Sequence, residues 1–127
     1  MKQSIRVVDE VGKEVHHALT ALLGLEDFNV VGYEIHKHEG VLILFCVVKH
    51  DVAVCPDCHR ISGAPHEYQR RVKRDLPAFG LRCYLEYDHR RFKCPHCGKP
   101  FTEVLNGVPF KGRYTARYEH YIFEQYR

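Results

Sequence analysis

Hydrophobic residues near the N-terminus recur at helical spacing. They are Val8, Val11, Val15, Leu19 and Leu22, and charged side chains lie between them. Steps of three and four residues match the turn of an α-helix, so these side chains share one face. The pattern predicts an N-terminal helix that ends at Gly24.

After residue 29 the spacing becomes that of strands. Residues 30–36 and 41–48 are rich in β-branched and aromatic side chains, and the polar segment 37–40 separates them. This arrangement predicts a β-hairpin. Because the run VLILFCVV at 41–48 is apolar throughout, we expect the second strand to be buried on both faces.

The second half of the chain begins with a polar segment. Residues 60–80 are punctuated by glycine and proline, a pattern typical of turns, whereas residues 81–92 alternate well enough to predict a strand. Thr115 is a suitable N-cap for a helix that starts at Ala116. Since this amphipathic helix reaches the C-terminus without a stop signal, we expect the chain to be a fragment of a longer protein.

Composition excludes several classes of protein. The chain has 127 residues, of which 45% are hydrophobic and 28% are charged, as in a folded domain. No apolar run approaches the roughly 18 residues of a membrane span. The N-terminus carries charges where a signal peptide would be apolar, so we expect a cytoplasmic protein with reduced thiols.

Four cysteines form two closely spaced pairs. The pairs are Cys55-Pro-Asp-Cys58 and Cys94-Pro-His-Cys97. Two intervening residues let a tight turn aim both sulfurs at one ion, and two such turns create a tetrahedral four-thiolate site. We predict one structural Zn²⁺ ion bound by these four cysteines. Such a closed site has no open position for catalysis, and no other catalytic motif occurs, so we expect no enzyme activity.

Iron is the main alternative to zinc at these cysteines. Rubredoxin-like sites use similar pairs but favour glycine after each second cysteine, and here His59 follows Cys58 whereas Gly98 follows Cys97. An iron site would make the chain a small electron-transfer protein. We therefore favour zinc.

The remaining cysteines and several histidines offer further ligand types. Cys46 and Cys83 lie in predicted strands without a partner at ligand spacing, so we expect buried apolar positions. His59 or His96 could replace one cysteine, because each lies within or beside a pair. We expect four other histidines to be solvated, namely His16, His17, His36 and His38.

Charge is distributed unevenly along the chain. Residues 1–59 carry a net charge of −4, residues 60–93 carry +5 and residues 94–127 carry +2. Candidate DNA contacts in the basic middle are Arg70, Arg71, Lys73, Arg74, Arg90, Arg91 and Lys93. Clustered cations of this kind bind phosphates, whereas the competing interpretation is that they balance the net charge of −2 on zinc with four thiolates.

Several short motifs follow one another along the chain, namely LLGLEDFNVVGYEI, CPDC, His66, RRVKRDLP at 70–77, RRFKC at 90–94 and FTE. Their order resembles the N-terminal zinc-binding region of the ISL-three family of insertion-sequence transposases. The resemblance covers about 22–118 and implies recognition of terminal inverted repeats ahead of a helix-turn-helix segment and an Asp-Asp-Glu catalytic domain. It implies the four cysteines as ligands, and Arg70, Arg71, Arg74, Arg90 and Arg91 as DNA contacts. The chain departs from the family at His59, where glycine is usual, and in the two-residue spacing of the second pair.

Together these features predict an α+β fold, a small zinc-ribbon-like β-hairpin domain with an N-terminal and a C-terminal helix. Residues 1–28 form the helical segment, residues 29–112 the β domain with its four-cysteine site, and residues 113–127 the start of a helix leading to a missing segment. In the first functional hypothesis zinc aligns both basic runs on one face that binds double-stranded DNA. In the alternative the chain is a protein-interaction module that contacts the rest of a transposase or a second copy.

Overall fold

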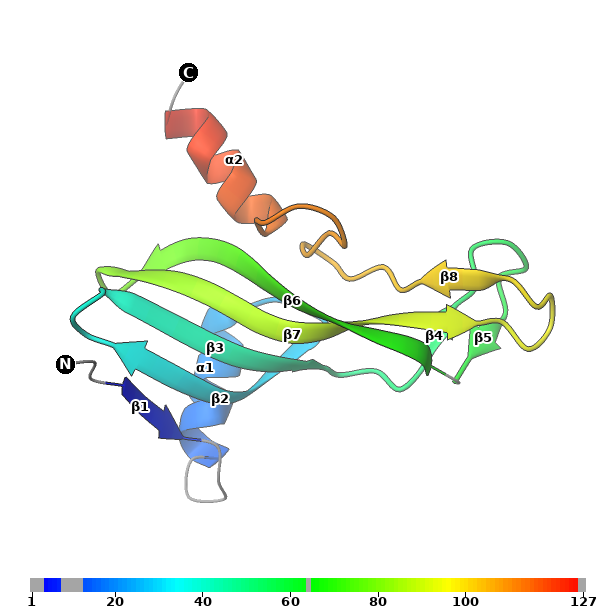
Figure 1. Ribbon diagram of the computed structural model, residues 1–127, viewed down its shortest axis with the longest axis horizontal. Helices are drawn as coiled ribbons and strands as arrows, with labels where there is room; N and C mark the ends of the chain where they lie inside the picture. The colour runs from blue at the N-terminus through cyan, green and yellow to red at the C-terminus, as the bar shows by residue number, and fades with distance from the viewer. Residues whose placement is uncertain (1–3, 8–12, 64, 126–127) are drawn as a thin grey trace.

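The computed structural model describes residues 4–7, 13–63 and 65–125, and their main feature is one large twisted sheet (Figure 1). The strands of this sheet lie in the order β1-β2-β3-β7-β6, and β8 pairs with β7. A separate pair, β4 and β5, forms a second small sheet. The elements are β1 (Ser4–Val7), α1 (Lys13–Leu23), β2 (Phe28–His36), β3 (Val41–Val48), β4 (Ala53–Val54), β5 (Ile61–Ser62), β6 (Pro65–Ala78), β7 (Leu81–Lys93), β8 (Pro100–Thr102) and α2 (Ala116–Gln125).

The α+β class with a helix near each end is confirmed, and so is the β2–β3 hairpin. The helix predicted from Val8 is present over Lys13–Leu23, whereas residues 8–12 lie outside the described residues. The strands that were not predicted include the short β5 and β8. They also include β1, which precedes the helix, and β6, a strand of 14 residues within the segment that the sequence marks as polar. In the part of the chain that the structure describes, no helix is long and apolar enough to cross a membrane.

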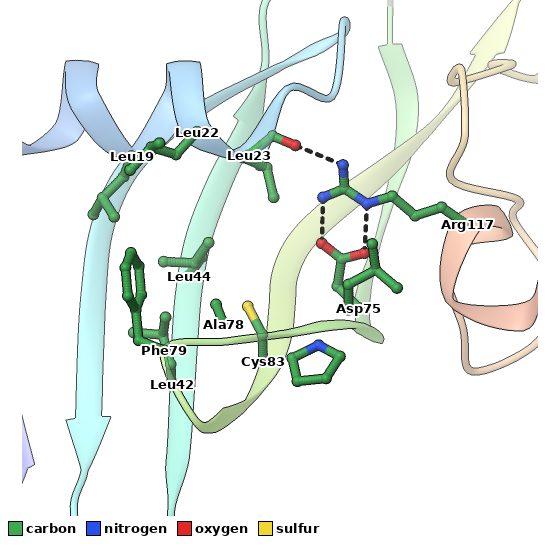
Figure 2. A pocket seen from close by; sticks show the side chains of 12 residues that line it. Leu19, Leu22, Leu23, Leu42, Leu44, Asp75, Ala78, Phe79, Cys83 and Arg117 are labelled. Atoms are coloured by element: carbon green, nitrogen blue, oxygen red, sulfur yellow. Dashed lines mark hydrogen bonds and ion pairs between the residues drawn. The ribbon is translucent and has the colours of Figure 1, made fainter. Parts of the chain in front are cut away.

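Helix α1 contacts the sheet through a face that differs from the predicted one. Val15 is 44% exposed and Leu22 is 71% exposed, whereas His16 and Leu23 are buried. The expectation that His16 is solvated is therefore wrong, because its ring packs edge-on against Tyr33. Figure 2 shows Leu19 and Leu23 projecting from α1 toward the sheet region that bears Leu42 and Leu44.

A polar contact fixes this unexpected rotation of α1. The Thr20 hydroxyl accepts a hydrogen bond from the Val30 amide at 2.8 Å and donates to the His16 carbonyl at 2.8 Å. Thr20 therefore joins α1 directly to β2. The prediction used only the spacing of apolar residues and could not include this hydrogen bond. The buried face of α1 was therefore predicted incorrectly.

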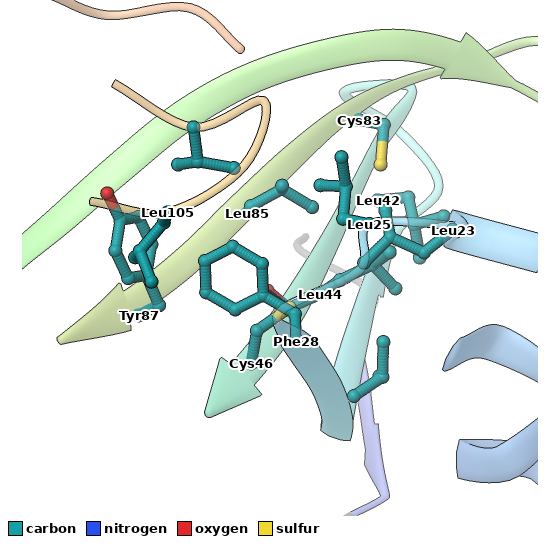
Figure 3. Close-up of a cluster of buried hydrophobic side chains, with 12 residues drawn as sticks. Leu23, Leu25, Phe28, Leu42, Leu44, Cys46, Cys83, Leu85, Tyr87 and Leu105 are labelled. Atoms are coloured by element: carbon teal, nitrogen blue, oxygen red, sulfur yellow. Dashed lines mark hydrogen bonds between the residues drawn. The ribbon is translucent and has the colours of Figure 1, made fainter. Parts of the chain in front are cut away.

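The main core lies between α1, the sheet and the loop at residues 105–108 (Figure 3). Phe28, Leu44, Leu85 and Tyr87 are buried there, and the Phe28 and Tyr87 rings meet edge to face with centroids 5.0 Å apart. Burying this much apolar surface is the principal stabilising contribution to the body of the molecule.

Cys46 and Cys83 belong to the same core, as predicted. Each is only 3% exposed, and burial raises the pKa of each thiol to about 12. They are therefore neutral thiols that fill apolar space.

Strand β3 is buried on one face only, so the prediction of burial on both faces is wrong. Leu42, Leu44 and Cys46 point into the core, whereas the alternate side chains are partly accessible and Val47 is 46% exposed. Parallel pairing with β7 accounts for the continuous apolar run, but no helix among the described elements covers the second face.

Helix α2 is joined to the sheet by a buried carboxylate. The Asp75 side chain accepts hydrogen bonds from the Thr115 hydroxyl at 2.8 Å and from Arg117, whose Nη1 also donates to the Leu23 carbonyl at 2.7 Å (Figure 2). Thr115 is the helix cap, as predicted, because its hydroxyl also accepts from the Tyr118 amide at 3.3 Å. The Asp75–Arg117 pair thus connects β6, α1 and α2.

We expect Asp75→Ala to lower the free energy of unfolding by about 3 kcal/mol, because it leaves the Arg117 guanidinium without its buried partner. Urea unfolding of the zinc-loaded protein measures this change. Asp88→Ala is the matched control, since Asp88 forms an exposed ion pair with Arg70 and should cost less than about 1 kcal/mol. Equal effects of the two changes would contradict the assigned role of Asp75.

The same carboxylate makes stability depend on pH. Burial alone would raise the pKa of Asp75, but hydrogen bonds from Arg117 and Thr115 outweigh burial and lower it. A lowered folded pKa gives stabilisation that is present above the unfolded value of about 3.9 and is lost as the pH falls below it. The difference in unfolding free energy between the wild type and Asp75→Asn should be constant above about pH 5 and should shrink at lower pH. A difference that does not change with pH would contradict this prediction.

Candidate metal centre

The first cysteine pair occupies a tight turn between β4 and β5. The Cys55 amide donates to the Arg60 carbonyl at 2.9 Å, and the His59 amide donates to the Cys55 carbonyl at 2.9 Å. His59 has a positive φ of 62°, a conformation that glycine adopts most easily and that histidine tolerates better than most residues. The departure from the family pattern at this position therefore preserves the turn.

The second pair repeats the same turn between β7 and β8. The Cys94 amide donates to the Lys99 carbonyl at 3.0 Å, and the Gly98 amide donates to the Cys94 carbonyl at 2.8 Å. Gly98 takes the position of His59 with a φ of 74°. Each turn therefore presents its two sulfurs in the same way.

The four sulfur atoms of these cysteines converge on one point. All four lie within 4.8 Å of one another, with Cys55 Sγ 3.7 Å from Cys97 Sγ and Cys58 Sγ 3.4 Å from Cys94 Sγ. A tetrahedron with zinc–sulfur bonds of about 2.3 Å separates its sulfurs by about 3.8 Å, so this donor set fits Zn²⁺. The ion would hold the two turns together and leave no coordination position for a reactant.

Backbone amides favour the thiolate form of Cys94, whereas desolvation and the neighbouring thiols outweigh the Arg60 amide and raise the pKa of Cys58 to about 11. Hydrogen bonds from the amides of Cys97 and His96 outweigh desolvation and lower the pKa of the Cys94 thiol to about 6. Among the described residues, the cluster with metal-binding geometry contains the four cysteines and no histidine. His59 and His96 are exposed, and His96 Nδ1 instead lies 3.2 Å from Arg60 Nη1, which links the two turns.

A small apolar cluster supports the site. Phe92 and Phe101 stack with centroids 5.6 Å apart beside the buried Cys55 and Cys94. We call residues 51–62 and 92–102, which contain both turns, the zinc lobe. Figure 1 shows that β6 and β7 extend beyond β2 and β3 toward this lobe.

The Arg90 side chain closes the base of the zinc lobe. Its guanidinium forms hydrogen bonds of 2.9–3.2 Å with the Glu103 carboxylate and a further bond of 2.5 Å to the His50 carbonyl. The Arg90 and Glu103 side chains are only 11% and 4% exposed. Arg90 is thus a structural ion-pair partner that connects three chain segments where they enter the lobe.

The basic residues predicted as DNA contacts do not line one face. Arg70 lies opposite Asp88, whereas Arg71 lies opposite the buried Tyr87, so neighbouring cations point to opposite sides of the sheet. Arg70 also forms an ion pair with Glu86 at 3.3 Å. The expectation of a single aligned face was wrong because side chains alternate along a strand.

The structure also differs from the prediction that Lys73 contacts DNA. Its side chain is fully buried, and its ammonium donates to the Phe110 carbonyl at 3.1 Å and the Gly112 carbonyl at 2.5 Å. It therefore has no surface on which to receive a phosphate. Arg91, by contrast, is partly accessible and bonds Thr102, and Lys93 is exposed.

Two cations that are not among the predicted DNA contacts lie beside the basic part of β6. Lys111 and Arg113 are exposed, and the Arg113 carbonyl accepts a hydrogen bond from the Arg74 amide at 2.7 Å. No local pattern marks them, because almost 40 residues separate them from Arg74 in the sequence. The only local sign of this basic site in the sequence is the tripeptide Lys-Gly-Arg at 111–113, shortly before the helix cap.

We expect Cys55→Ser and Cys97→Ser to lose zinc and to unfold the zinc lobe, since metal binding contributes on the order of 10 kcal/mol in small zinc domains. Zinc content by mass spectrometry and backbone amide exchange measure both effects. Cys46→Ala and Cys83→Ala are the matched controls and should retain the metal while losing about 1–2 kcal/mol of stability. Retention of zinc by the Ser variants would refute the assigned ligands.

Comparison with known proteins agrees with this geometry. Residues 51–107 match the family described as the zinc-finger of transposase IS204/IS1001/IS1096/IS1165. No curated protein and no solved structure matches the chain. The matched residues contain all four cysteines together with β6 and β7. Residues 51–107 are thus similar to the zinc-finger of these transposases, and the ion suited to their four thiolates is zinc.

Proposed function

We propose that this chain is a DNA-recognition part of a transposase and that it binds the terminal inverted repeats of an insertion sequence. The observation that carries the proposal is the four-thiolate site within a segment that matches the transposase zinc finger. The zinc ion has a structural role in this function. Strand cleavage would be performed elsewhere in the transposase, because a closed four-thiolate site cannot activate water.

The position of the basic residues supports DNA binding over neutralisation of the metal site. Arg71 and Arg74 lie six and nine residues after Pro65, where β6 begins. At about 3.3 Å per strand residue they are about 20–30 Å beyond that point. This separation exceeds the Debye length of about 10 Å at moderate salt, so these charges do not balance the thiolates. Neutralisation of the metal site, which the interaction-module alternative assigns to the cations, therefore does not account for Arg71 and Arg74.

Binding of the zinc-loaded protein to a random duplex should weaken steeply with salt. About four to six phosphate contacts would make the logarithm of the association constant fall against the logarithm of salt concentration with a slope near −4 to −5. Fluorescence anisotropy of a labelled duplex measures this slope, and the chelated protein is the control. Binding that is absent, or that does not respond to salt, would contradict the proposal.

Selection from a random duplex pool tests the finer part of the proposal. Repeated capture on the immobilised zinc-loaded protein should enrich one sequence, and that sequence should occur in inverted orientation at the two ends of an insertion sequence. Enrichment requires contacts with base edges, because phosphate contacts alone do not distinguish sequences. A pool that stays random would leave a nonspecific DNA-binding domain and exclude inverted-repeat recognition.

A further inference from the structure

Residues 110–115 lie along the outer edge of β6. The Arg74 amide donates to the Arg113 carbonyl at 2.7 Å, and the Thr115 amide donates to the Arg74 carbonyl at 2.9 Å. Arg74 and Tyr114 form a parallel β-bridge at this point. The short loop therefore continues the sheet by one residue and adds its own side chains to those of β6.

Lys73 holds this loop in place. Its buried ammonium donates to the carbonyls of Phe110 and Gly112, which are thereby directed inward. Burial, with a further contribution from the nearby charge of Arg71, lowers the pKa of Lys73. Lys111 and Arg113 are exposed. They alternate along the loop with Phe110 and Gly112, whose carbonyls accept these bonds.

Two arginines of β6 are fixed beside the loop without an acidic partner. The Arg71 guanidinium lies over the Phe110 ring at 4.4 Å, and the Arg74 guanidinium lies over the Tyr118 ring at 4.9 Å. Within the described part of the chain no ion pair joins either arginine to a carboxylate. Arg71 Nη2 donates to Gln69 Oε1 at 2.7 Å, and the Nε atom of each arginine is buried without a hydrogen-bond partner. Both guanidinium groups therefore carry an uncompensated charge, and only their Nη atoms remain for contact with a ligand.

Arg82 and Arg91 of β7 also form no ion pair among the described residues, and they bond the Glu39 carbonyl and the Thr102 hydroxyl instead. Three further arginines differ in this respect. Arg70 pairs with Glu86 and Asp88, Arg90 pairs with Glu103, and the neighbouring Arg117 pairs with Asp75. Their charges are balanced within the protein. An arginine that is held by an aromatic ring and lacks a carboxylate is suited to bidentate contact with a phosphate.

We propose that Arg71, Arg74, Lys111 and Arg113, which we call the β6 ridge, bind the phosphate backbone of duplex DNA. Arg71 and Arg74 belong to opposite faces of β6, so the ridge follows the outer edge of the strand and not one face of the sheet. The inference rests on the DNA-binding function proposed above and assigns that function to a surface. Lys73 acts as a positioning residue that keeps Lys111 and Arg113 beside the two arginines. Because phosphates carry no sequence information, the β6 ridge supplies affinity and orientation.

The exposed cations of the zinc lobe form the competing surface. Lys93 and Lys99 are exposed there, but Asp57 is exposed in the same lobe, and zinc with four thiolates contributes a net charge of −2. These negative charges lower the attraction for phosphates. The β6 ridge has no such site beneath it, and its nearest buried carboxylate, Asp75, is neutralised by Arg117.

Three double variants, each removing two positive charges, test the assignment. They are Lys111→Gln with Arg113→Gln in the β6 ridge, Lys93→Gln with Lys99→Gln in the zinc lobe, and Lys37→Gln with Lys49→Gln at remote exposed positions. The ridge variant should weaken duplex binding and reduce the magnitude of the salt slope by about 2, since each lost phosphate contact changes it by about 0.9. The other two should keep nearly the wild-type slope.

Zinc content and the unfolding midpoint of each variant confirm that the fold is intact. Equal losses in all three variants would mean that affinity follows net charge alone, which would overturn the β6 ridge. A loss confined to the zinc-lobe variant would also overturn it while leaving the DNA-binding function in place. Failure of the wild-type protein to bind duplex DNA would overturn the function and the ridge together.

Arg71→Lys with Arg74→Lys provides a second measurement that keeps the net charge. Lysine cannot contact a phosphate through a planar fork and stacks less well on Phe110 and Tyr118. We expect weaker binding with a nearly unchanged salt slope. Wild-type affinity in this variant would overturn the roles assigned to the two guanidinium groups.

Discussion

Coordination of one ion by four thiolates is the interaction on which the zinc lobe depends. The apolar cluster of the zinc lobe contains little more than Phe92 and Phe101 beside the cysteines. Such a small cluster cannot offset the conformational entropy of ordering two turns and three short strands. The metal replaces the missing core, whereas the body has its own core around Phe28, Leu85 and Tyr87.

What could be predicted from the sequence was local in character. The cysteine spacing defines each metal-binding turn within six residues, and Thr115 marks its helix without reference to distant contacts. Strand β6 was missed because Pro65, Pro77 and its many charges resemble a loop. Proline and charge are tolerated there because β6 lies at the sheet edge, which is a property of the whole sheet. The rotation of α1 and the position of Lys111 likewise depend on contacts between distant segments.

The basic run Arg-Arg-Val-Lys-Arg-Asp shows how one strand divides similar residues among different tasks. Alternation places Lys73 and Asp75 on the buried side, where one orders a loop and the other anchors a helix. Arg70 is compensated on the opposite side by acidic residues of β7. The different roles of these side chains follow from the pairing of β6 with β7 and from the contacts of residues 110–117. A count of positive charges therefore overstates the surface available to a nucleic acid.

The hydrogen bonds of Arg90 have a consequence for the cooperativity of unfolding. This guanidinium joins His50 ahead of the first cysteine turn to Glu103 after the second, so the segments that enter the zinc lobe are tied at one level. Contacts within the zinc lobe depend on the metal, whereas contacts in the body of the molecule depend on an apolar core. The molecule therefore consists of two cooperative units with Arg90 at their boundary, and local opening of the metal-dependent unit can end there without spreading into the body.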